Sequence, residues 1–373
     1  MKRLIAICVL LFTLCGCSAT ADSSGSGITW SELQKSGQEN LRYATEFQID
    51  YYGSYTLLTI REAGQYLLVP EGAPVPGGLP EGMTVLQQPT DKIYLAATSA
   101  MDLYRGANAL QNIRLTSLDA PGWYIEEAKQ ALADGRMVFA GKYSAPDYER
   151  IFAEGCRLAV ESTMIYHTPE VKEQLERLGI PVLVERSSYE SHPLGRLEWI
   201  KLHGLLTGHL ADAAEFFDRT SAAAEETMQQ PKTGKTVAFF SVSSTGTVTV
   251  RKASDYIARM IDLAGGTYIF SDLDGDSATS TLNMQMESFF DRAQNADILI
   301  YNSTTAGEIR SLDELYALSG MFRQFSAAEN GNVYCTGKNF FQQTTALAPF
   351  MAEIGAVVRE EAPENLQYLH KLR

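Results

Sequence analysis

The sequence has few histidines and cysteines and no apolar run long enough to cross a membrane. Its 373 residues include 5 histidines and 5 cysteines. The one prominent apolar run, Leu4–Leu14, is roughly 11 residues long, whereas a membrane-spanning helix needs about 20. The chain is therefore not expected to be a polytopic membrane protein, and a histidine-rich metal site has few residues to draw on.

Basic side chains are also in deficit. The chain has 31 Lys and Arg against 45 Asp and Glu, a net charge of −14. Nucleic-acid binding generally needs a broad basic surface, so nucleic acid is excluded as an expected partner. Because 45% of the residues are hydrophobic and only 20% are charged, the composition is that of a folded protein rather than a disordered one.

Motifs of common enzymes are absent as well. No two histidines have the HExxH spacing of zinc hydrolases, and there is no GxSxG nucleophile turn. The acidic stretch at 272–276 departs from a calcium loop at its sixth position, Ser277, and its twelfth, Asn283. The sequence gives no positive sign of catalysis, and we predict a protein that is not an enzyme.

The N-terminus has the layout of a secretory signal. Lys2 and Arg3 precede the apolar run, which ends in Leu14-Cys15-Gly16-Cys17. A small residue directly before a cysteine is similar to the bacterial lipobox, in which Cys17 would become the lipidated first residue of the mature protein. We predict a signal peptide at 1–16 and a tether and lead-in at 17–45; the alternative is ordinary cleavage near Ala19 or Ala21.

Two cysteines remain in the folded part of the chain, Cys156 and Cys335. They are far apart in sequence and fall in different halves of the chain, so we expect neither a disulfide nor a shared metal. Both are predicted to be small buried residues.

The body of the chain predicts an α/β fold. Residues 46–69 are typical of two or three strands in a meander, and from about residue 92 short apolar runs alternate with helical stretches. Such alternation indicates parallel sheets covered by helices on both faces. The predicted strands are 93–97, 137–140, 158–161, 182–185, 237–241, 298–301 and 332–334; the predicted helices include 145–154, 169–178 and 253–264.

A single long helix is predicted at 194–230. This stretch has no proline and carries apolar residues at 3- and 4-residue spacing, from Trp199 to Phe217. A helix of that length would reach from one α/β lobe to another, so we expect an N-terminal lobe at 46–193 and a C-terminal lobe at 231–373.

The two halves repeat one pattern. Glu149 opens a helix that leads to the strand RLAVES, and Glu287 opens a helix that leads to ILIYNS. Small polar residues follow both strands at their carboxyl ends, where open α/β sheets bind ligands. We therefore expect a ligand cleft between the two lobes.

Five segments resemble, in order, the substrate-binding lipoproteins of ABC importers for iron–siderophore complexes, haem and cobalamin. They are KYSAPDYERIFAEGCRLAVES, LERLGIPVLVE, EWIKLHGLLTG, LAGGTYIF and FSAAENGNVY, within residues 89–355. The chain departs from the family at Gly155-Cys156-Arg157, where Pro-Asp is usual, in the meander, and in a helix after Glu287 about two residues longer than that after Glu149.

The resemblance implies two Rossmann-like lobes on one long helix, with a ligand caught between them and passed to an ABC permease dimer with its ATPase subunits. It also implies a monomer without an intrinsic cofactor, exported and lipid-anchored to the outer face of the cell membrane. In the family, glutamates matching Glu149 and Glu287 project toward arginines of the permease. The plain alternative is that both acids only stabilise their helix N-termini.

The predicted ligand-binding residues follow the expected strands. They are Ser99, Met101, Tyr143, Ser162, Thr163, Met164, His167, Arg186, Ser187, Ser188 and Tyr189 in the N-terminal lobe, and Ser243, Ser244, Thr245, Arg251, Tyr301, Asn302, Ser303 and Phe340 in the C-terminal lobe. Each has an ordinary alternative, as a helix cap or a lobe-edge plug. Arg186 and Arg251 would either grip an anion or pair with an acid.

The ligand is expected to be an iron complex, either a siderophore or haem, or a corrinoid. Aromatic walls would favour a flat macrocycle and arginines an anionic ferric complex, and the candidate loops contain both. Two alternatives stay open: a receptor for a bare Zn or Mn ion, and a surface lipoprotein enzyme or interaction module that reuses the fold.

Overall fold

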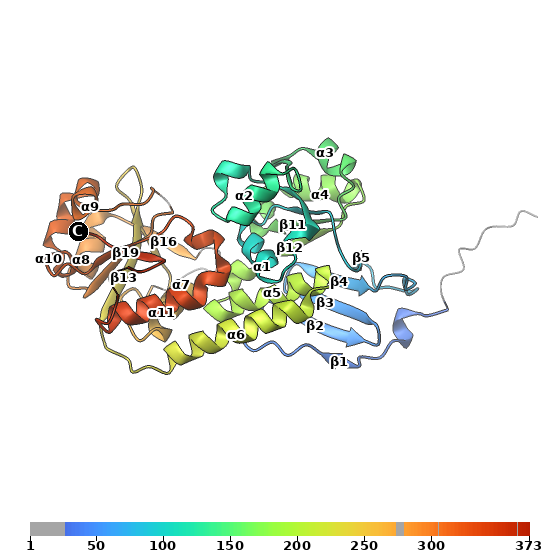
Figure 1. The fold of residues 1–373 in the computed structure, drawn as a ribbon, viewed down its shortest axis with the longest axis horizontal. Coiled ribbons are helices and arrows are strands. Elements are labelled where there is room, and N and C mark those ends of the chain that lie inside the picture. The colour runs from blue at the N-terminus through green and yellow to red at the C-terminus, as the bar shows by residue number, and fades with distance from the viewer. Residues whose placement is uncertain (1–26, 274–279, 305, 364) are drawn as a thin grey trace, which may run out of the picture.

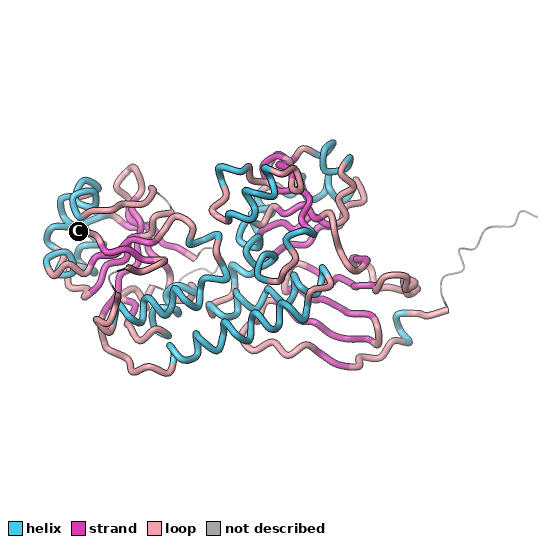
Figure 2. Tube along the Cα trace, viewed as in Figure 1, coloured by secondary structure: helices cyan, strands magenta, loops and turns pink. Residues whose placement is uncertain are grey.

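The computed structural model describes residues 27–273, 280–304, 306–363 and 365–373. They form a mixed α/β fold in which an N-terminal sheet and two α/β lobes surround a pair of long helices (Figures 1 and 2). The predicted signal peptide and Cys17 lie outside these residues. Within them, no helix combines the length and apolar character that a membrane span requires.

The N-terminal sheet extends the predicted meander to five strands in sequential order. Neighbouring strands are antiparallel except for the last pair, which is parallel. One face packs on the long helices, where the Phe47 and Trp199 rings lie 4.9 Å apart. The strands are β1 (Gly37–Gln38), β2 (Phe47–Tyr52), β3 (Tyr55–Ile60), β4 (Gly64–Val69) and β5 (Thr84–Gln87).

The N-terminal lobe is a parallel five-stranded sheet in the order β12-β11-β6-β7-β8. Its inner strands are mostly buried, as expected for strands covered on both faces. The strands are β6 (Ile93–Leu95), β7 (Ile113–Thr116), β8 (Val138–Phe139), β11 (Leu158–Ser162) and β12 (Val182–Glu185); β9 (Gly141–Lys142) and β10 (Ala145–Pro146) form a separate hairpin. The helices are α1 (Met101–Gly106), α2 (Glu126–Ala133), α3 (Tyr148–Ala153) and α4 (Pro169–Arg177).

The C-terminal lobe has a sheet in the order β16-β14-β13-β17-β18-β19, with β15 also paired to β13. Strands β13, β17 and β18 are parallel, and antiparallel strands flank them. The strands are β13 (Thr236–Val242), β14 (Val248–Arg251), β15 (Thr267–Tyr268), β16 (Thr281–Met284), β17 (Ile298–Tyr301), β18 (Val333–Thr336) and β19 (Leu369–Lys371). The helices are α7 (Tyr256–Leu263), α8 (Met286–Ala293), α9 (Leu312–Leu318), α10 (Ser326–Glu329) and α11 (Leu347–Val358).

The prediction of one long helix at 194–230 is wrong. The region forms two helices, α5 (Pro193–Thr207) and α6 (Leu210–Met228), which lie side by side (Figure 1). Gly208 adopts φ 81°, and this left-handed residue ends α5. Lys201 on α5 contacts the Phe217 ring on α6 at 4.8 Å, on the far side of the turn, so the helices run antiparallel.

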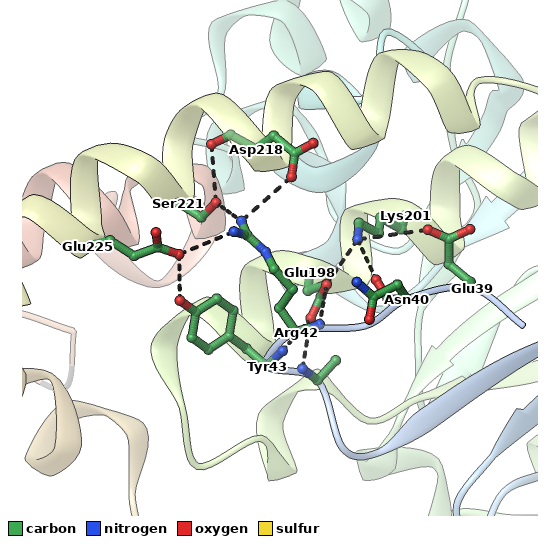
Figure 3. A network of polar contacts seen from close by, with 10 residues as sticks. Glu39, Asn40, Arg42, Tyr43, Glu198, Lys201, Asp218, Ser221 and Glu225 are labelled. Atoms are coloured by element: carbon green, nitrogen blue, oxygen red, sulfur yellow. Dashed lines mark hydrogen bonds and ion pairs between the residues drawn. The ribbon is translucent and has the colours of Figure 1, made fainter.

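A polar network fixes the segment between β1 and β2 to these helices (Figure 3). The fully buried Glu198 carboxylate on α5 accepts hydrogen bonds from the backbone N–H groups of Arg42, Tyr43 and Ala44 at 2.9, 2.7 and 2.9 Å. Lys201 pairs with the same carboxylate at 3.0 Å. The charge of Glu198 is therefore compensated from two sides, and the sheet is held against the helix pair.

The two cysteines of the described chain are unpaired, as the sequence predicts. Cys335 is buried on β18, whereas Cys156 is half-buried beside β11 rather than fully covered. Burial raises the pKa of the Cys156 thiol to about 11 and that of Cys335 to about 12, so both stay protonated at neutral pH.

Candidate functional site

A cavity of about 420 Å³ lies between the two lobes. Side chains and backbone of both lobes line it: Thr98 and Tyr124 from the N-terminal lobe, and Ser303, Thr304, Gly307, Lys338, Phe341 and Gln342 from the C-terminal lobe. Three other hollows, of about 270, 410 and 550 Å³, are each lined by a single part of the molecule.

The lining residues follow the carboxyl ends of parallel strands. Thr98 follows β6, Tyr124 follows β7, Ser303 follows β17, and Lys338 and Phe341 follow β18. This edge of an open α/β sheet is the usual ligand-binding edge, because no sheet hydrogen bonds occupy it and the loops there are free to carry function. The cavity therefore lies at the sheet edge where ligand sites of this fold class are usual.

Two aromatic side chains give the cavity its apolar character. Tyr124 comes from the N-terminal lobe and is 41% exposed, and Phe341 comes from the C-terminal lobe. Lys338 is the one charged side chain among the described lining residues, and it is exposed. Aromatic faces bind flat conjugated molecules, and a lysine binds an anionic group.

Arg251 supports this cavity from behind instead of lining it. Its guanidinium carbon lies 5.1 Å from the centre of the Phe341 ring and its Nη1 lies 3.6 Å from a carboxylate oxygen of Asp255. The prediction that Arg251 contacts the ligand directly is therefore corrected. The sequence left open whether this arginine grips an anion or pairs with an acid, and the structure shows it beside the acid Asp255.

Other predicted residues of the C-terminal lobe surround the cavity at different depths. Ser303 lines it, and its backbone N–H donates to the Thr336 hydroxyl at 3.1 Å. Asn302 accepts hydrogen bonds from the backbone and hydroxyl of Thr304 and so shapes the loop. Tyr301 and Phe340 are buried, so their side chains belong to the core. Their prediction as ligand contacts is wrong.

The remaining candidates of this lobe form a turn. Ser243 accepts hydrogen bonds through its hydroxyl from the backbone N–H groups of Thr245 and Thr247, which closes the β13–β14 hairpin. Ser244 lies at the exposed tip of the same turn. Ser243, Ser244 and Thr245 do not line the cavity.

Three candidates of the N-terminal lobe, Ser99, Met101 and Tyr143, differ in outcome. Ser99 is next to the cavity residue Thr98, and its carbonyl accepts a hydrogen bond from Thr344 of the other lobe at 2.9 Å. Met101 is completely buried in the first turn of α1, so its prediction as a ligand contact is wrong. Tyr143 lies in the β9–β10 hairpin and packs on a separate apolar cluster.

The predicted residues after β11 and β12 gather at a different place on the same sheet edge. Ser162 caps the short helix η5 (Thr163–His167), in which Met164 and His167 are exposed. Ser187, Ser188 and Tyr189 form the short helix η6. None of these residues lines the cavity, whose residues from the N-terminal lobe follow β6 and β7.

Arg186 is occupied by carboxylates of the N-terminal sheet. Its Nη2 lies 3.1 Å from Glu46 and 3.0 Å from Glu62, and its guanidinium carbon lies 4.2 Å from the centre of the Tyr189 ring. The side chain is only 5% exposed. The expectation of an anion-gripping arginine is corrected here, since the acids of the meander already neutralise it.

Of the eight lining residues the sequence predicts only Ser303, and seven were missed: Thr98, Tyr124, Thr304, Gly307, Lys338, Phe341 and Gln342. Tyr124 was missed because no strand was predicted at Ile113–Thr116, the residues of β7. The alternation of apolar and polar residues there, followed by the turn at 119–122, was a usable signal of a strand. Phe341 is the neighbour of the predicted Phe340, and a short helix at Phe340–Gln342 decides which of the two rings faces the cavity.

No cluster of His, Cys, Asp or Glu in the described residues groups three side chains around a common point, as a metal ion would require.

The two glutamates with a predicted docking role occupy equivalent positions. Glu149 and Glu287 are each the second residue of a helix, α3 and α8, and both are exposed. Helix α8 has 8 residues against 6 in α3, as the sequence predicts.

No known family model matches the sequence. An uncharacterised lipoprotein of Methanocaldococcus jannaschii is 22% identical over 92% of this chain and 89% of its own length. A second uncharacterised lipoprotein of that organism is 24% identical over 92% of this chain and 91% of its own length.

Solved structures of similar shape are ligand-binding proteins. A periplasmic heme-binding protein of Vibrio cholerae matches with a TM-score of 0.57 and 16% identity, covering 70% of this chain and 98% of its own. One of Pseudomonas aeruginosa matches with a TM-score of 0.57 and 14% identity, covering 76% and 98%. The periplasmic vitamin B12-binding protein of Vibrio cholerae matches with a TM-score of 0.51 and 12% identity, covering 73% and 99%.

The chain has the periplasmic binding-protein fold. The resemblance drawn from the sequence is therefore confirmed for the fold. At identities of 12–16% the ligands of these proteins do not transfer to this chain.

Proposed function

We propose that this protein is the extracytoplasmic substrate-binding component of an ABC importer. It captures an iron complex, a siderophore or haem, or a corrinoid in the cavity between its lobes. The observation that carries the proposal is the cavity itself, which both lobes line at the carboxyl ends of β6, β7, β17 and β18. A site shared by two lobes suits reversible capture of a small molecule.

The lining favours a flat conjugated ligand with an anionic group. Tyr124 and Phe341 offer aromatic faces from opposite lobes, and Lys338 offers a positive charge at the edge. Haem has this combination of a flat ring and carboxylates, and an aromatic ferric siderophore shares it in part.

The alternative of a receptor for bare Zn or Mn ions finds no support in this lining. The lining residues of the described chain include no His, Cys, Asp or Glu, which are the side chains that bind these ions. The alternative of an enzyme gains no support either, because the hydroxyls of Ser303 and Thr304 are hydrogen-bonded to Thr336 and Asn302 and not to a basic side chain.

Two further features complete the proposal. Cys17 carries the lipid anchor, and the segment up to η1 (Trp30–Glu32) tethers the folded part to the outer face of the membrane. Glu149 and Glu287 dock the two lobes on the two permease subunits, whose ATPase subunits drive uptake. The structure gives neither glutamate an ion-pair partner among the described residues, so both charges are available.

Absorbance titration tests the ligand class directly. Haemin, cobalamin, and ferric hydroxamate and catecholate siderophores are titrated separately into the purified protein. We expect one of these probes to bind with 1:1 stoichiometry and to show a shifted absorbance band. Failure of all four to bind would contradict the proposal.

Variants then locate the binding site. Tyr124→Ala together with Phe341→Ala should weaken binding by about tenfold or more, because two aromatic contacts are lost. Phe152→Ala is the matched control, since this ring is 63% exposed on α3 and lies outside the cavity lining. Unchanged affinity in the double variant would place the ligand elsewhere.

A further inference from the structure

One segment of the C-terminal lobe crosses to the N-terminal lobe. We name residues 339–346, between β18 and α11, the crossing segment. It contains the short helices η8 (Phe340–Gln342) and η9 (Thr344–Ala346). Thr344 and Thr345 of this segment form one attachment to the N-terminal lobe, through Ser99 and Asp102, and Gln342 forms a second.

The first attachment is buried and carries a charge. The Thr345 backbone N–H and hydroxyl both donate to Asp102 Oδ2, at 2.8 and 2.5 Å. Arg105 donates to Asp102 Oδ1 at 2.7 Å and to the Thr345 hydroxyl at 3.0 Å. Asp102 is 0% exposed and Thr345 is 8% exposed. Breaking this attachment would leave a buried carboxylate without its partners, which is costly.

The second attachment is a pair of neutral hydrogen bonds at the cavity. Gln342 Nε2 donates to the Gly122 carbonyl at 2.8 Å, and the Tyr124 backbone N–H donates to Gln342 Oε1 at 2.8 Å. Gln342 is half-buried and Tyr124 is 41% exposed. Water has access to these groups, so both ends of each hydrogen bond are satisfied by solvent when the attachment opens.

The two attachments therefore differ in the free energy needed to open them. The Asp102–Thr345 attachment is charged and dry, and the Gln342 attachment is neutral and wet. Since Gln342 and Tyr124 both line the cavity, separation at this place widens the cavity while the buried attachment keeps the lobes together.

We propose that Gln342 is a positioning residue that latches the cavity: its carboxamide holds the Tyr124 backbone opposite Phe341, and ligand enters and leaves when this latch opens about the Asp102–Thr345 attachment. The proposal rests on the proposed function only in taking the cavity as the ligand site. The latch itself is a property of the lobes without ligand.

The first test measures the distance between the lobes without ligand. Spin labels are introduced at Glu126 and Arg310, two exposed positions on different lobes, through an unnatural amino acid that leaves the cysteines untouched. Gln342→Ala should raise the population of longer distances by about tenfold, because two hydrogen bonds of the closed form are lost. An unchanged distance distribution would overturn the proposal.

Gln343→Ala is the matched control for this variant. Gln343 is the next residue of the crossing segment and accepts a hydrogen bond from Asn339 within the same lobe at 2.8 Å. Its replacement should leave the distance distribution as in the unmodified protein. If it widens the distribution as much as Gln342→Ala does, the whole segment has loosened and the latch is refuted.

The second test measures rates with a probe that binds in the titration. A latch slows entry and exit alike, so Gln342→Ala should raise both the association and dissociation rate constants by about tenfold. A simple ligand contact would raise the dissociation rate constant alone, and that outcome contradicts the latch. If no probe binds, the proposed function fails, while the distance measurement still decides the latch.

Discussion

Glu161 is an acid buried in the N-terminal lobe without a hydrogen-bond partner. It is 1% exposed on β11, and neither carboxylate oxygen has a partner among the described residues. The neighbouring Tyr94 hydroxyl is buried and unpaired as well. Burial raises the pKa of Glu161 from 4.5 to about 8, so the carboxyl group is protonated at neutral pH.

This raised pKa gives stability a definite pH dependence. Below pH 4.5 the carboxyl group is neutral in both the folded and the unfolded chain. As pH rises from 4.5 to about 8, the unfolded chain loses this proton while the folded chain keeps it, so the free energy of unfolding falls. Above about pH 8 both states have lost this proton, and the free energy of unfolding falls no further because of Glu161.

Glu161→Gln should remove this loss. We expect the variant to match the unmodified protein at about pH 4 and to exceed its free energy of unfolding at about pH 8 by roughly 2–4 kcal/mol. Urea unfolding at the two pH values measures the difference. Glu173→Gln is the control, because Glu173 is exposed on α4 and its replacement should show no such pH dependence. Equal curves for Glu161→Gln and the unmodified protein would refute the assignment.

For single residues, the sequence identifies the loops that carry the candidate site better than it identifies which side chains of those loops line the cavity. Ser303 was predicted and lines the cavity, whereas Phe340 was predicted and its neighbour Phe341 lines it. Strand ends are visible as apolar runs, but the rotation of a short helix is set by tertiary packing. Arg186 was predicted as a ligand contact for the same reason: its partners Glu46 and Glu62 are 140 and 124 residues away in the chain, so the sequence does not show their pairing.

The turn between helices α5 and α6 is hard to predict from the sequence for a related reason. Apolar residues continue at 3- and 4-residue spacing across the turn, from Leu206 to Leu210, so the period does not change where the chain reverses. The reversal needs only Gly208 and His209, between the last residue of α5 and the first of α6. A glycine is the one signal of this turn, and glycine also occurs inside helices, as Gly204 does here.

Gly204 is required where the two helices approach most closely. A Cβ atom on Gly204 would lie 2.6 Å from the Ala213 Cβ and 2.8 Å from the His209 carbonyl oxygen. Both neighbours are rigid parts of the turn and of α6. The absence of a side chain at 204 therefore sets the distance between the helices that carry the lobes.

Gly204→Ala should destabilise the protein by about 1–3 kcal/mol, because overpacking outweighs the gain of about 1 kcal/mol in helix propensity. Urea unfolding, with the slope against urea concentration unchanged, measures the effect. Gly320→Ala is the control, since nothing lies within 4 Å of its added Cβ atom. A Gly204→Ala protein that is as stable as the unmodified one would show that the helices separate at little cost.

For the whole molecule, the sequence predicts the α/β class, four of the five strands of the N-terminal lobe's parallel sheet, and the parallel strands β13, β17 and β18 of the C-terminal lobe, but not β14, β15, β16 and β19. Strands β12 and β17 have the predicted bounds, Val182–Glu185 and Ile298–Tyr301. The N-terminal sheet has five strands instead of two or three, because β1 has 2 residues and β5 pairs across a loop rich in proline and glycine. Elements this short have almost no sequence period, and only pairing in the folded chain defines them.

The repeated pattern of the two lobes has a consequence for the whole molecule. Glu149 and Glu287 occupy the second position of α3 and α8, one on each lobe, and both are exposed. Two charges on separate lobes allow a partner with two similar subunits to contact both at once. Exposed charge pairs steer association and weaken with salt, so docking on the permease should be salt-sensitive.

Reversing both charges tests this directly. Glu149→Arg together with Glu287→Arg should abolish uptake and ligand-stimulated ATP hydrolysis by the transporter, because like charges would then face each other at both contacts. Ligand affinity of the isolated protein should not change, since neither residue lines the cavity. Radiolabelled uptake, ATPase activity in proteoliposomes and the absorbance titration measure the three quantities.

A control for net charge is needed because the double reversal makes an acidic protein less acidic. Glu173→Arg with Glu226→Arg changes the net charge equally at two exposed positions, on α4 and α6. This control protein should support normal uptake. If it fails to the same degree, the overall charge governs association and the two helix-start glutamates have no special role. If uptake instead survives the reversal of Glu149 and Glu287, the lobes dock through other residues, because no permease arginine would tolerate arginine at both contacts.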